Sequence, residues 1–367
     1  MKKVVVGLSG GVDSSVAAYL LKKQGYEVLG VTMCVLPKEH SEIENAMVRD
    51  AEAVAKQLGI AYEAVDYREQ FQTHVIDYFA SEYKLGRTPN PCVMCNRYVK
   101  WEAILSYGEK HGADLIATGH YARIGRLPNG RFSVCNSVTA QKDQTYVLFQ
   151  LTQEQLLRTL MPVGDYTKEE IRAIAREAGI PVAAKKDSQE ICFIPDHDYA
   201  GFIGRKQDAG RQQLAADAQN VPENNGCDCP GNFVTKDGQI LGQHEGIIHY
   251  TIGQRKGLGI AFGKPMFVTQ IRPETNEVVI GEHEDLMARE LYCDHVNFMA
   301  LEEPKPGESF ETIGKIRYAH QGTPAKITML EDGRLKAEFA QPVRAVTPGQ
   351  AAVFYIGEYI ACGGIII

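Results

Sequence analysis

The sequence lacks any long apolar run. No stretch of its 367 residues approaches the roughly 18 consecutive apolar positions that a membrane-spanning helix needs. The N-terminal segment MKKVVVGLSGGVDSS also lacks the apolar core of a secretory signal peptide, because its short apolar run ends in glycine and serine. These two absences predict a cytoplasmic protein with no membrane partner.

Cysteine is sparse as well. Nine cysteines, an odd number, in 367 residues are too few for a disulfide scaffold. The thiols are therefore expected to be reduced, catalytic or metal-binding. Cys34, Cys135, Cys293 and Cys362 lie in apolar, strand-like runs, where a buried and inert thiol is the usual case.

Acidic residues are absent from three long windows, although the net charge of the chain is −7. The overall charge argues against general affinity for nucleic acid. The windows 83–101, 246–272 and 312–329 nevertheless contain lysine and arginine without any acid. If the windows converge, they form a phosphate-binding surface on an acidic body. Taken singly, each is equally well explained as a solvated loop.

The length and the 44% hydrophobic content predict two or three domains, each with a core. In the first half, strand and helix patterns alternate, which predicts an α/β fold with a parallel sheet covered on both faces. Ligands are then expected at the carboxyl ends of the strands. The predicted strands are 4–8, 27–34, 62–66 and 114–118, and the predicted helices are 14–24, 42–58, 71–84, 96–110, 153–160 and 168–178.

The pattern changes after a short β-like run at 191–194. Residues 207–225 are polar and without periodicity, and beyond them short strand patterns such as 335–339 and 351–355 are separated by turns. We predict three domains: a catalytic α/β domain at 1–210, a small central domain at 211–273, and a C-terminal β-barrel at 274–367.

The most specific local signal is the loop GLSGGVDS at residues 7–14, between the first strand and the first helix. Its glycines let backbone amides approach an oxyanion, and the helix N-terminus and serine hydroxyls add donors. No lysine follows Gly11, which excludes a Walker A loop, and the glycine spacing does not fit a dinucleotide fingerprint. The loop resembles the SGGxDS signature of the PP-loop ATP pyrophosphatases, which split ATP into AMP and pyrophosphate. The structural alternative is a turn in which Asp13 caps the helix.

Two further segments contain cysteines. In GRTPNPCVMCN, at 86–96, two prolines stiffen a loop before a helix, and Cys95 is expected near the start of that helix. The helix dipole and Arg97 would there lower the pKa of the Cys95 thiol. In DSQEICFI, at 187–194, Cys192 has apolar neighbours and follows Lys185 and Lys186.

These segments together resemble the bacterial tRNA-specific 2-thiouridylases, the MnmA family. The resemblance extends over nearly the whole chain through GQRKGLG at 253–259, TGHYAR at 118–123, KDQ at 142–144 and Arg317-Tyr318. It implies ATP-dependent replacement of the 2-oxygen of the wobble uridine, position 34 of tRNA, by sulfur. The implied partners are tRNA and a sulfur-donor protein, either a cysteine desulfurase or a sulfur relay protein, and magnesium is expected with ATP.

The resemblance also assigns residues. Cys95 and Cys192 are the implied catalytic pair, with Cys192 as persulfide carrier and Cys95 as the thiolate that resolves the sulfur linkage. The implied ATP site is Gly7, Leu8, Ser9, Gly10, Gly11, Val12, Asp13, Ser14, Met33 and Gly119. The implied contacts to the target base are Asn90, Pro91 and Cys92. The implied tRNA contacts are His120, Lys142, Asp143, Gln144, Arg317, Tyr318 and Gln350. A flipped-out base would be received by the stiff proline loop.

One position departs from part of the family. Some members have Asp where this chain has Cys92, so an acid–base role does not transfer to that position. Cys92 and Cys95 form a CxxC, and Cys227 and Cys229 supply two more thiols, the right number for zinc or an iron–sulfur cluster. We expect no tightly bound metal and keep the cluster as an alternative.

Two other function classes compete. A PP-loop synthetase that joins ammonia or an amine to a small acid shares the loop and the α/β half, but it leaves both cysteine motifs unexplained. A redox or zinc-stabilised RNA-binding module explains the thiols but leaves the ATP loop without a role. AMP formed with a small acid and no tRNA would favour the synthetase, and RNA binding without AMP would favour the module.

Overall fold

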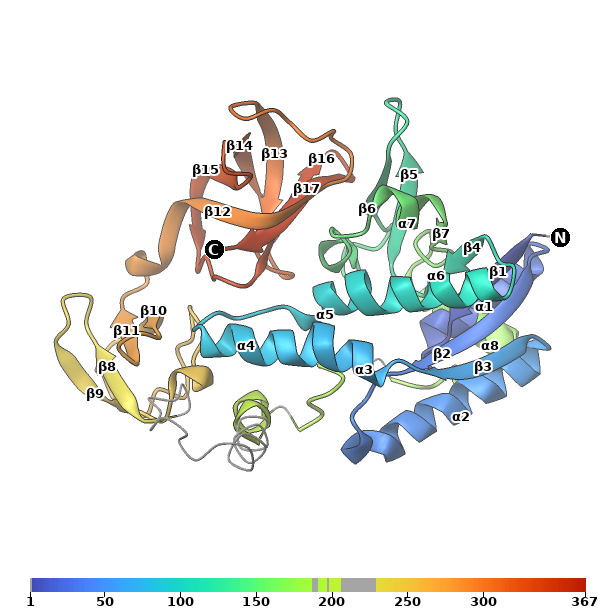
Figure 1. The fold of residues 1–367 in the computed structure, drawn as a ribbon, viewed down its shortest axis with the longest axis horizontal. Coiled ribbons are helices and arrows are strands. Elements are labelled where there is room, and N and C mark those ends of the chain that lie inside the picture. Colours follow the sequence, from blue (N-terminus) through green and yellow to red (C-terminus); the bar gives the residue numbers. More distant parts are fainter. Residues whose placement is uncertain (1, 187–190, 197, 206–228) are drawn as a thin grey trace, which may run out of the picture.

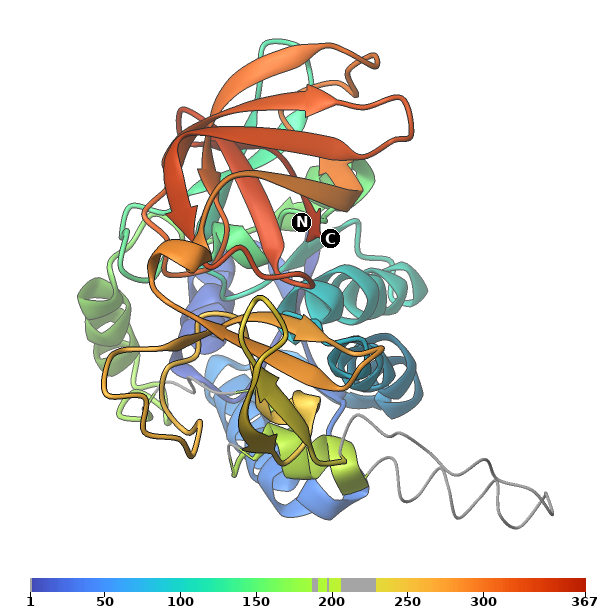
Figure 2. The ribbon, with the colours of Figure 1, turned by 90° about the vertical axis from the view of Figure 1, so that its left-hand side faces the viewer.

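The computed structural model describes residues 2–186, 191–196, 198–205 and 229–367. Figure 1 shows an N-terminal unit with a central sheet and helices, a small sheet at one end, and a C-terminal barrel. In Figure 2 the barrel lies above the N-terminal unit, and the strands of the small middle sheet lie in front of the N-terminal unit. The predicted fold class is confirmed.

The N-terminal sheet is parallel, with the strand order β3-β2-β1-β4-β7. Its strands are β1 (Lys3–Gly7), β2 (Glu27–Cys34), β3 (Ala61–Asp66), β4 (Leu115–Ala117) and β7 (Thr159–Leu160). The order of the strands reverses at β1, which pairs with β2 on one side and β4 on the other. The connection after β1 leads to β2 on one side, and the connection after β4 leads toward β7 on the other side. Open parallel sheets bind ligands in the crevice between two such connections.

Both faces of this sheet are buried, as its apolar strands predict. Val4 and Val6 face one core, and Val5, which points the other way, faces a second. The first core contains residues of α1 (Val12–Lys23), α2 (Ser41–Leu58) and α8 (Lys168–Glu177). The second contains residues of α6 (Trp101–Lys110) together with residues of the barrel.

The helical segments that carry the first cysteine motif are not regular α-helices. We predicted uniform helices at 71–84 and 96–110. In the structure, one π-helical segment interrupts each of these helical regions. The elements are α3 (Arg68–Phe71), η2 (Gln72–Asp77), α4 (Tyr78–Lys84), α5 (Pro91–Met94), η3 (Cys95–Lys100) and α6 (Trp101–Lys110). The second helix thus begins at Pro91, since proline lacks the N–H that the first helical turn leaves unused.

The C-terminal barrel is antiparallel and closes through β12–β17 pairing. Its strands are β12 (Met287–Phe298), β13 (Ser309–Lys315), β14 (Thr323–Met329), β15 (Leu335–Arg344), β16 (Ala351–Ile356) and β17 (Tyr359–Ile366). A hairpin of the N-terminal unit, β5 (Ala122–Arg126) and β6 (Phe132–Asn136), extends this sheet where Cys135 pairs with Tyr359. The barrel is thereby fixed to the N-terminal unit by backbone pairing.

The middle sheet has the order β10-β11-β8-β9. Its strands are β8 (Gly231–Val234), β9 (Ile240–His244), β10 (Phe267–Arg272) and β11 (Glu277–Gly281). Because β11 pairs with β10 and β8, this sheet continues past the boundary predicted at residue 273. The whole polar segment 207–225, and with it the boundary predicted at residue 210, lies outside the described residues.

Two local predictions were wrong. Residues 191–194 form turns, not a strand, since their apolar side chains pack into a core without pairing to a neighbouring strand. The helix expected at 153–160 is α7 (Gln153–Leu157), and the following Thr159–Leu160 pairs with β4. The remaining short helices are η1 (Lys38–His40), η4 (Thr145–Val147), η5 (Ile247–His249) and η6 (Glu284–Leu286). In the described ranges, no helix combines the length and apolarity of a membrane span.

Trp101, at the start of α6, connects this helix to the sheet. It is fully buried, and its indole N–H donates to the Thr159 hydroxyl at 2.9 Å. Replacing Thr159→Val keeps the shape but leaves the indole N–H without its acceptor. We expect a loss of about 1–3 kcal/mol in the free energy of unfolding, measured by urea denaturation. Thr328→Val, at a partly exposed barrel position, is the control and should change stability little. Equal stability of the Thr159→Val and unmodified proteins would show that this hydrogen bond contributes nothing.

Candidate active site

The glycine–serine loop joins the end of β1 to the start of α1. Gly10 has φ +66, and an added Cβ would lie 2.5 Å from the Met47 carbonyl oxygen, so the backbone here requires glycine. The Ser9 amide donates to the Ser14 hydroxyl at 3.1 Å, which holds the loop against the helix. Gly11 is the N-cap of α1, and within the described residues no side chain caps this helix. The first amides of α1 are therefore free to meet an anion.

Asp13 is not a helix cap, which excludes that alternative for the loop. Its carboxylate accepts from the Lys168 ammonium at 2.7 and 2.9 Å and from the Tyr121 hydroxyl at 2.8 Å. Lys168 is 7% exposed. The ion pair fixes the first turn of α1 to α8, so Asp13 has a structural role in holding the loop.

The residues predicted for the nucleotide site lie together at the switch point of the sheet. The loop follows β1, Met33 is next to last in the neighbouring β2, and Gly119 follows β4. A Cβ at Gly119 would lie 2.5 Å from the Ser14 backbone nitrogen. The loop after β4 is thus packed directly against the first turn of α1, in the place where such sheets bind ligands.

The first two thiols lie on the helical segment that begins at Pro91, with Asn90 as its N-cap. The Asn90 side chain caps this helix by accepting from the Cys92 amide at 3.1 Å. Cys92 is exposed at the first turn, whereas Cys95 lies one turn further along and is buried. Cys95 is therefore not at the helix start, contrary to the prediction.

The expected lowering of the Cys95 pKa was also wrong. Burial raises the pKa of the Cys95 thiol to about 11, while the positive charge of Lys100 acts to lower it and Cys92 to raise it. Arg97, the expected cause of a lowered pKa, is instead paired with Glu102 at 3.0 Å. Lys100 is the cation that acts on this thiol.

Cys192 is held close to Cys95 by its neighbour Phe193. Phe193 is 1% exposed and packs in the same hydrophobic cluster as Cys95. Its ring makes edge contacts with Phe71 and Phe79, at centroid distances of 5.6 and 5.5 Å. Cys192 itself is exposed and reduced. Desolvation and the charges of Cys95 and Cys92 raise the pKa of its thiol, and Lys100 opposes them. The two predicted catalytic cysteines share one site.

A lysine connects the segment before Cys192 to the nucleotide loop. The Lys185 ammonium donates to the Gly10 carbonyl at 2.9 Å and to the Asp50 carboxylate at 2.6 Å. Residues 187–190 lie outside the described part of the chain. On either side of them, this segment contacts the loop through Lys185 and the thiol site through Phe193.

The loop before the first thiols is clamped by the other two units. The Thr88 amide donates to the Pro348 carbonyl at 2.8 Å, and the Gln350 side chain donates to the Thr88 carbonyl at 2.7 Å. The Thr88 and Thr251 hydroxyls are 3.3 Å apart. Gln350, expected to contact tRNA, thus holds the loop that precedes Asn90, Pro91 and Cys92.

Several other residues expected to contact tRNA have internal partners. The Asp143 carboxylate is 9% exposed and accepts from the Ser137 amide at 2.9 Å and the Thr145 amide at 3.1 Å. Gln144 accepts from the Tyr121 amide at 2.8 Å. Tyr318 is half exposed, whereas Lys142 and Arg317 are partly buried.

His120 contacts Trp101, the residue that follows Lys100. Its ring is 5.5 Å from the Trp101 ring, and its Nδ1 is 2.9 Å from the Thr118 hydroxyl. Burial and the charge of Lys100 lower the pKa of His120 to about 3. The ring is neutral at physiological pH and cannot supply positive charge to a phosphate.

The cysteines outside this site are mostly buried, as expected. Cys135, Cys293 and Cys362 are buried, and Cys34 is half-buried. No group of three His, Cys, Asp or Glu side chains suited to a metal ion occurs among the described residues. Cys227 lies outside those residues, so the alternative of a cluster that includes it stays a prediction.

Sequence reasoning missed Lys168, and it noted Lys185 and the window that contains Lys100 without predicting the contacts that these two lysines make. Lys168 carried a usable signal, because a lysine in the first turn of a helix is opposed by the helix dipole and needs another partner. Lys185 carried none, since its partners Gly10 and Asp50 are distant in sequence. Lys100 carried none, since the π turn that relates it to Cys95 leaves no pattern in the sequence.

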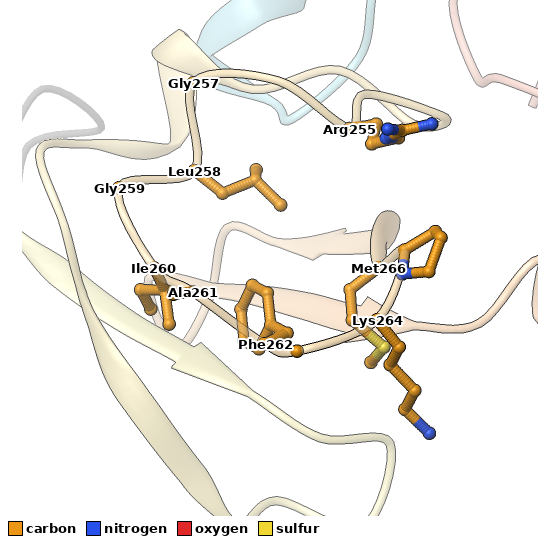
Figure 3. Close-up of a pocket in the computed structure, with 11 residues that line it drawn as sticks. Arg255, Gly257, Leu258, Gly259, Ile260, Ala261, Phe262, Lys264 and Met266 are labelled. Carbon is orange, nitrogen blue, oxygen red and sulfur yellow. The ribbon is translucent and has the colours of Figure 1, made fainter.

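A cavity of about 650 Å³ lies in the middle unit, lined by Arg255 and residues 257–266 (Figure 3). Arg255, Phe262 and Lys264 are among its lining side chains. Part of the GQRKGLG motif lines this cavity, and among the described elements no strand–helix pair of a dinucleotide-binding unit flanks the motif. The cavity is separate from the nucleotide and thiol sites.

Comparison with known proteins follows the same three units. Residues 2–196 match the family described as tRNA methyl transferase HUP domain. Residues 223–282 match its PRC-barrel domain, and residues 288–366 match an aminomethyltransferase beta-barrel domain. A tRNA-specific 2-thiouridylase MnmA from Lachnoclostridium phytofermentans is 55% identical over the full length of both chains. This chain belongs to the MnmA family.

Other members are nearly as similar. The MnmA proteins of Clostridium acetobutylicum and Acetivibrio thermocellus are 49% and 48% identical to this chain, covering all of it and 99% of their own lengths. The resemblance of the motifs to the MnmA family is thereby confirmed.

The close approach of Gly119 to α1 gives a direct test of the nucleotide site. In Gly119→Ala, the added methyl group would meet backbone atoms of Asp13 and Ser14, which cannot swing away like a side chain. We expect ATP affinity to fall at least tenfold, measured by calorimetry, with melting temperature followed in parallel. Gly204→Ala, where a Cβ meets nothing within 4 Å, is the control. Unchanged ATP affinity in Gly119→Ala would place the nucleotide elsewhere.

Proposed function

We propose that this chain thiolates the wobble uridine, position 34, of tRNA. ATP activates the 2-oxygen of the base by adenylation, and a persulfide on Cys192 supplies the sulfur. The observation that carries this proposal is the meeting of Cys95 and Cys192, nearly a hundred positions apart in the chain, beside a PP-loop.

The first step is assigned to the loop of residues 7–14. The free amides at the start of α1 and the hydroxyl of Ser9 would hold the phosphates of ATP, which magnesium accompanies. The uridine O2 attacks the α-phosphorus, an O–P bond forms, and pyrophosphate leaves. The adenylated oxygen is then a good leaving group. Asp13 is already paired with Lys168, so it holds the loop and does not act as a base.

Sulfur transfer follows in two displacements. The terminal sulfur of the Cys192 persulfide attacks C2 of the base, a C–S bond forms, and AMP departs with the C–O electron pair. The Cys95 thiolate then attacks the Cys192 sulfur and breaks its bond to the transferred sulfur, which stays on the base as C=S. The products are 2-thiouridine, AMP and a Cys95–Cys192 disulfide. A thiol reductant resets the pair, and a sulfur-donor protein reloads Cys192.

The tRNA surface is assigned to the junction of the three acid-free windows. The first and second meet where Thr88 contacts Thr251. The third joins them because Arg317 donates to the Arg344 carbonyl and Arg344 donates to the Gly253 carbonyl. Their lysines and arginines can then contact phosphates while Cys92, exposed beside the buried Pro91, faces the base.

One assay distinguishes this function from its competitors. The protein is incubated with ATP, a persulfide source, a thiol reductant and unmodified tRNA, and nucleosides and AMP are analysed by mass spectrometry. We expect 2-thiouridine and AMP in equal amounts, both dependent on tRNA. AMP formed without tRNA and without thionucleoside would contradict the proposal.

The Cys192→Ser variant separates sulfur transfer from tRNA binding. We expect complete loss of 2-thiouridine with tRNA affinity within about twofold of the unmodified protein, because one atom changes and little contact area is lost. Affinity is measured by filter binding. Loss of tRNA binding in this variant, with the fold intact, would contradict the assignment of Cys192 as a sulfur carrier.

The Arg317→Ala variant tests the tRNA surface. Removing a phosphate contact should weaken tRNA binding and reduce the slope of log affinity against log salt by about one. Arg334→Ala, which removes an exposed barrel arginine paired with Asp332, is the charge-matched control and should leave the slope unchanged. If Arg317→Ala also keeps the slope, Arg317 lies outside the interface.

A further inference from the structure

Lys100 is a half-buried cation at the end of the first acid-free window, and the nucleotide site gives it no role. Within the described part of the chain, its ammonium makes no hydrogen bond or ion pair with any group. Arg97, on the same turn, is by contrast paired with Glu102. A partly desolvated ammonium without a counter-ion lowers the stability of the folded protein. Such a lysine is therefore expected to pair with an anion that forms during function.

The local backbone turns Lys100 toward the thiols. In a regular α-helix, positions 95 and 100 would be about 140° apart around the axis. The turn from Cys95 to Lys100 is a π turn, in which the Trp101 amide bonds to the Asn96 carbonyl five residues back. This wider turn brings residue 100 closer to the face that carries Cys95. π turns are frequent at functional sites.

The neighbours of Lys100 place it between the thiol site and His120. Val99 packs in the hydrophobic cluster that contains Cys95 and Phe193. Trp101 contacts the ring of His120. The charged and titratable groups that act on Lys100 are Cys95, Cys92 and Cys192, and Lys100 in turn acts on His120. Among the described residues, the groups that can form an anion and act on Lys100 are therefore these three thiols.

We propose that Lys100 is the counter-cation of the sulfur-transfer site, which stabilises the thiolate of Cys95 and the persulfide anion of Cys192 as they form. This inference rests on the proposed function for its role in the reaction. At rest the thiols are protonated, because burial raises the pKa of Cys95 to about 11 and raises that of Cys192 as well. The lysine lowers both values, so its removal must raise them further.

The test measures thiolate formation without ATP or tRNA. The purified full chain is alkylated with iodoacetamide between pH 6 and 10, and the rate at Cys95 and Cys192 is resolved by peptide mass spectrometry. In Lys100→Met we expect the rates at both cysteines to fall about tenfold at pH 8, the effect of one pKa unit. Lys100→Arg, which keeps the charge, should restore most of the rate. Lys100→Gln replaces Lys100→Met if that variant does not fold.

Two controls separate charge from damage. Cys34, half-buried and acted on by Glu44, Arg68 and Asp66 instead of Lys100, is an internal reference whose rate should stay constant. Arg97→Gln removes a neighbouring charge that Glu102 already neutralises, and it should leave Cys95 unchanged. Identical rates at Cys95 and Cys192 in Lys100→Met and the unmodified protein would overturn the proposal. So would equal losses in Lys100→Met and Lys100→Arg. Since alkylation needs no tRNA, failure of the thiolation assay would count against the proposed function alone.

Discussion

The packing of Phe193 is the interaction on which the thiol site depends. Its ring is enclosed by Phe71, Phe79 and Phe202, with centroid distances between 5.4 and 5.6 Å. Residues 191–194 form no strand, so this aromatic cluster, and not a backbone ladder, determines where Cys192 lies. Aromatic residues of this size dominate the energy of such contacts. This packing leaves residue Cys192 itself exposed, which suits the proposed loading of its thiol by another protein.

The two halves of the proposed chemistry are physically connected. The nucleotide loop lies at the switch point of the parallel sheet, and Lys185 joins its Gly10 carbonyl to the segment that leads to Cys192. The loop before Cys92 is held from outside the N-terminal unit, by Pro348 and Gln350 of the barrel side and by Thr251 of the middle unit. All three units therefore contribute to the position of the loop before Cys92, even though the proposed chemistry is assigned to the first unit.

Much of this arrangement could be predicted from the sequence. The strand at 27–34 is found with the predicted bounds. A short apolar run rich in β-branched residues and bounded by turn signals is typical of a buried strand. The loop at 7–14 could be predicted because glycines at this spacing let backbone amides approach an anion, and the serine hydroxyls add further donors. The π turns could not be predicted, since apolar spacing does not distinguish a uniform helix from one with a single wide turn. The strand Thr159–Leu160 is defined by its partner β4 and not by its own residues.

The chemistry of individual side chains was less predictable than their location. Cys95 and Cys192 were placed together by family resemblance, but the raised pKa of Cys95 depends on burial by segments distant in sequence. Asp143 and Gln350 looked like surface groups, yet their hydrogen bonds are satisfied by partners that only the folded chain supplies. The central claim is that Cys95 resolves the linkage made by Cys192. A single turnover with persulfidated protein, ATP and tRNA, followed by disulfide mapping, tests it most directly. The account predicts one Cys95–Cys192 disulfide for each 2-thiouridine formed. Thiouridine formed while both cysteines stay reduced, or a disulfide that links Cys92 to Cys95, would contradict it.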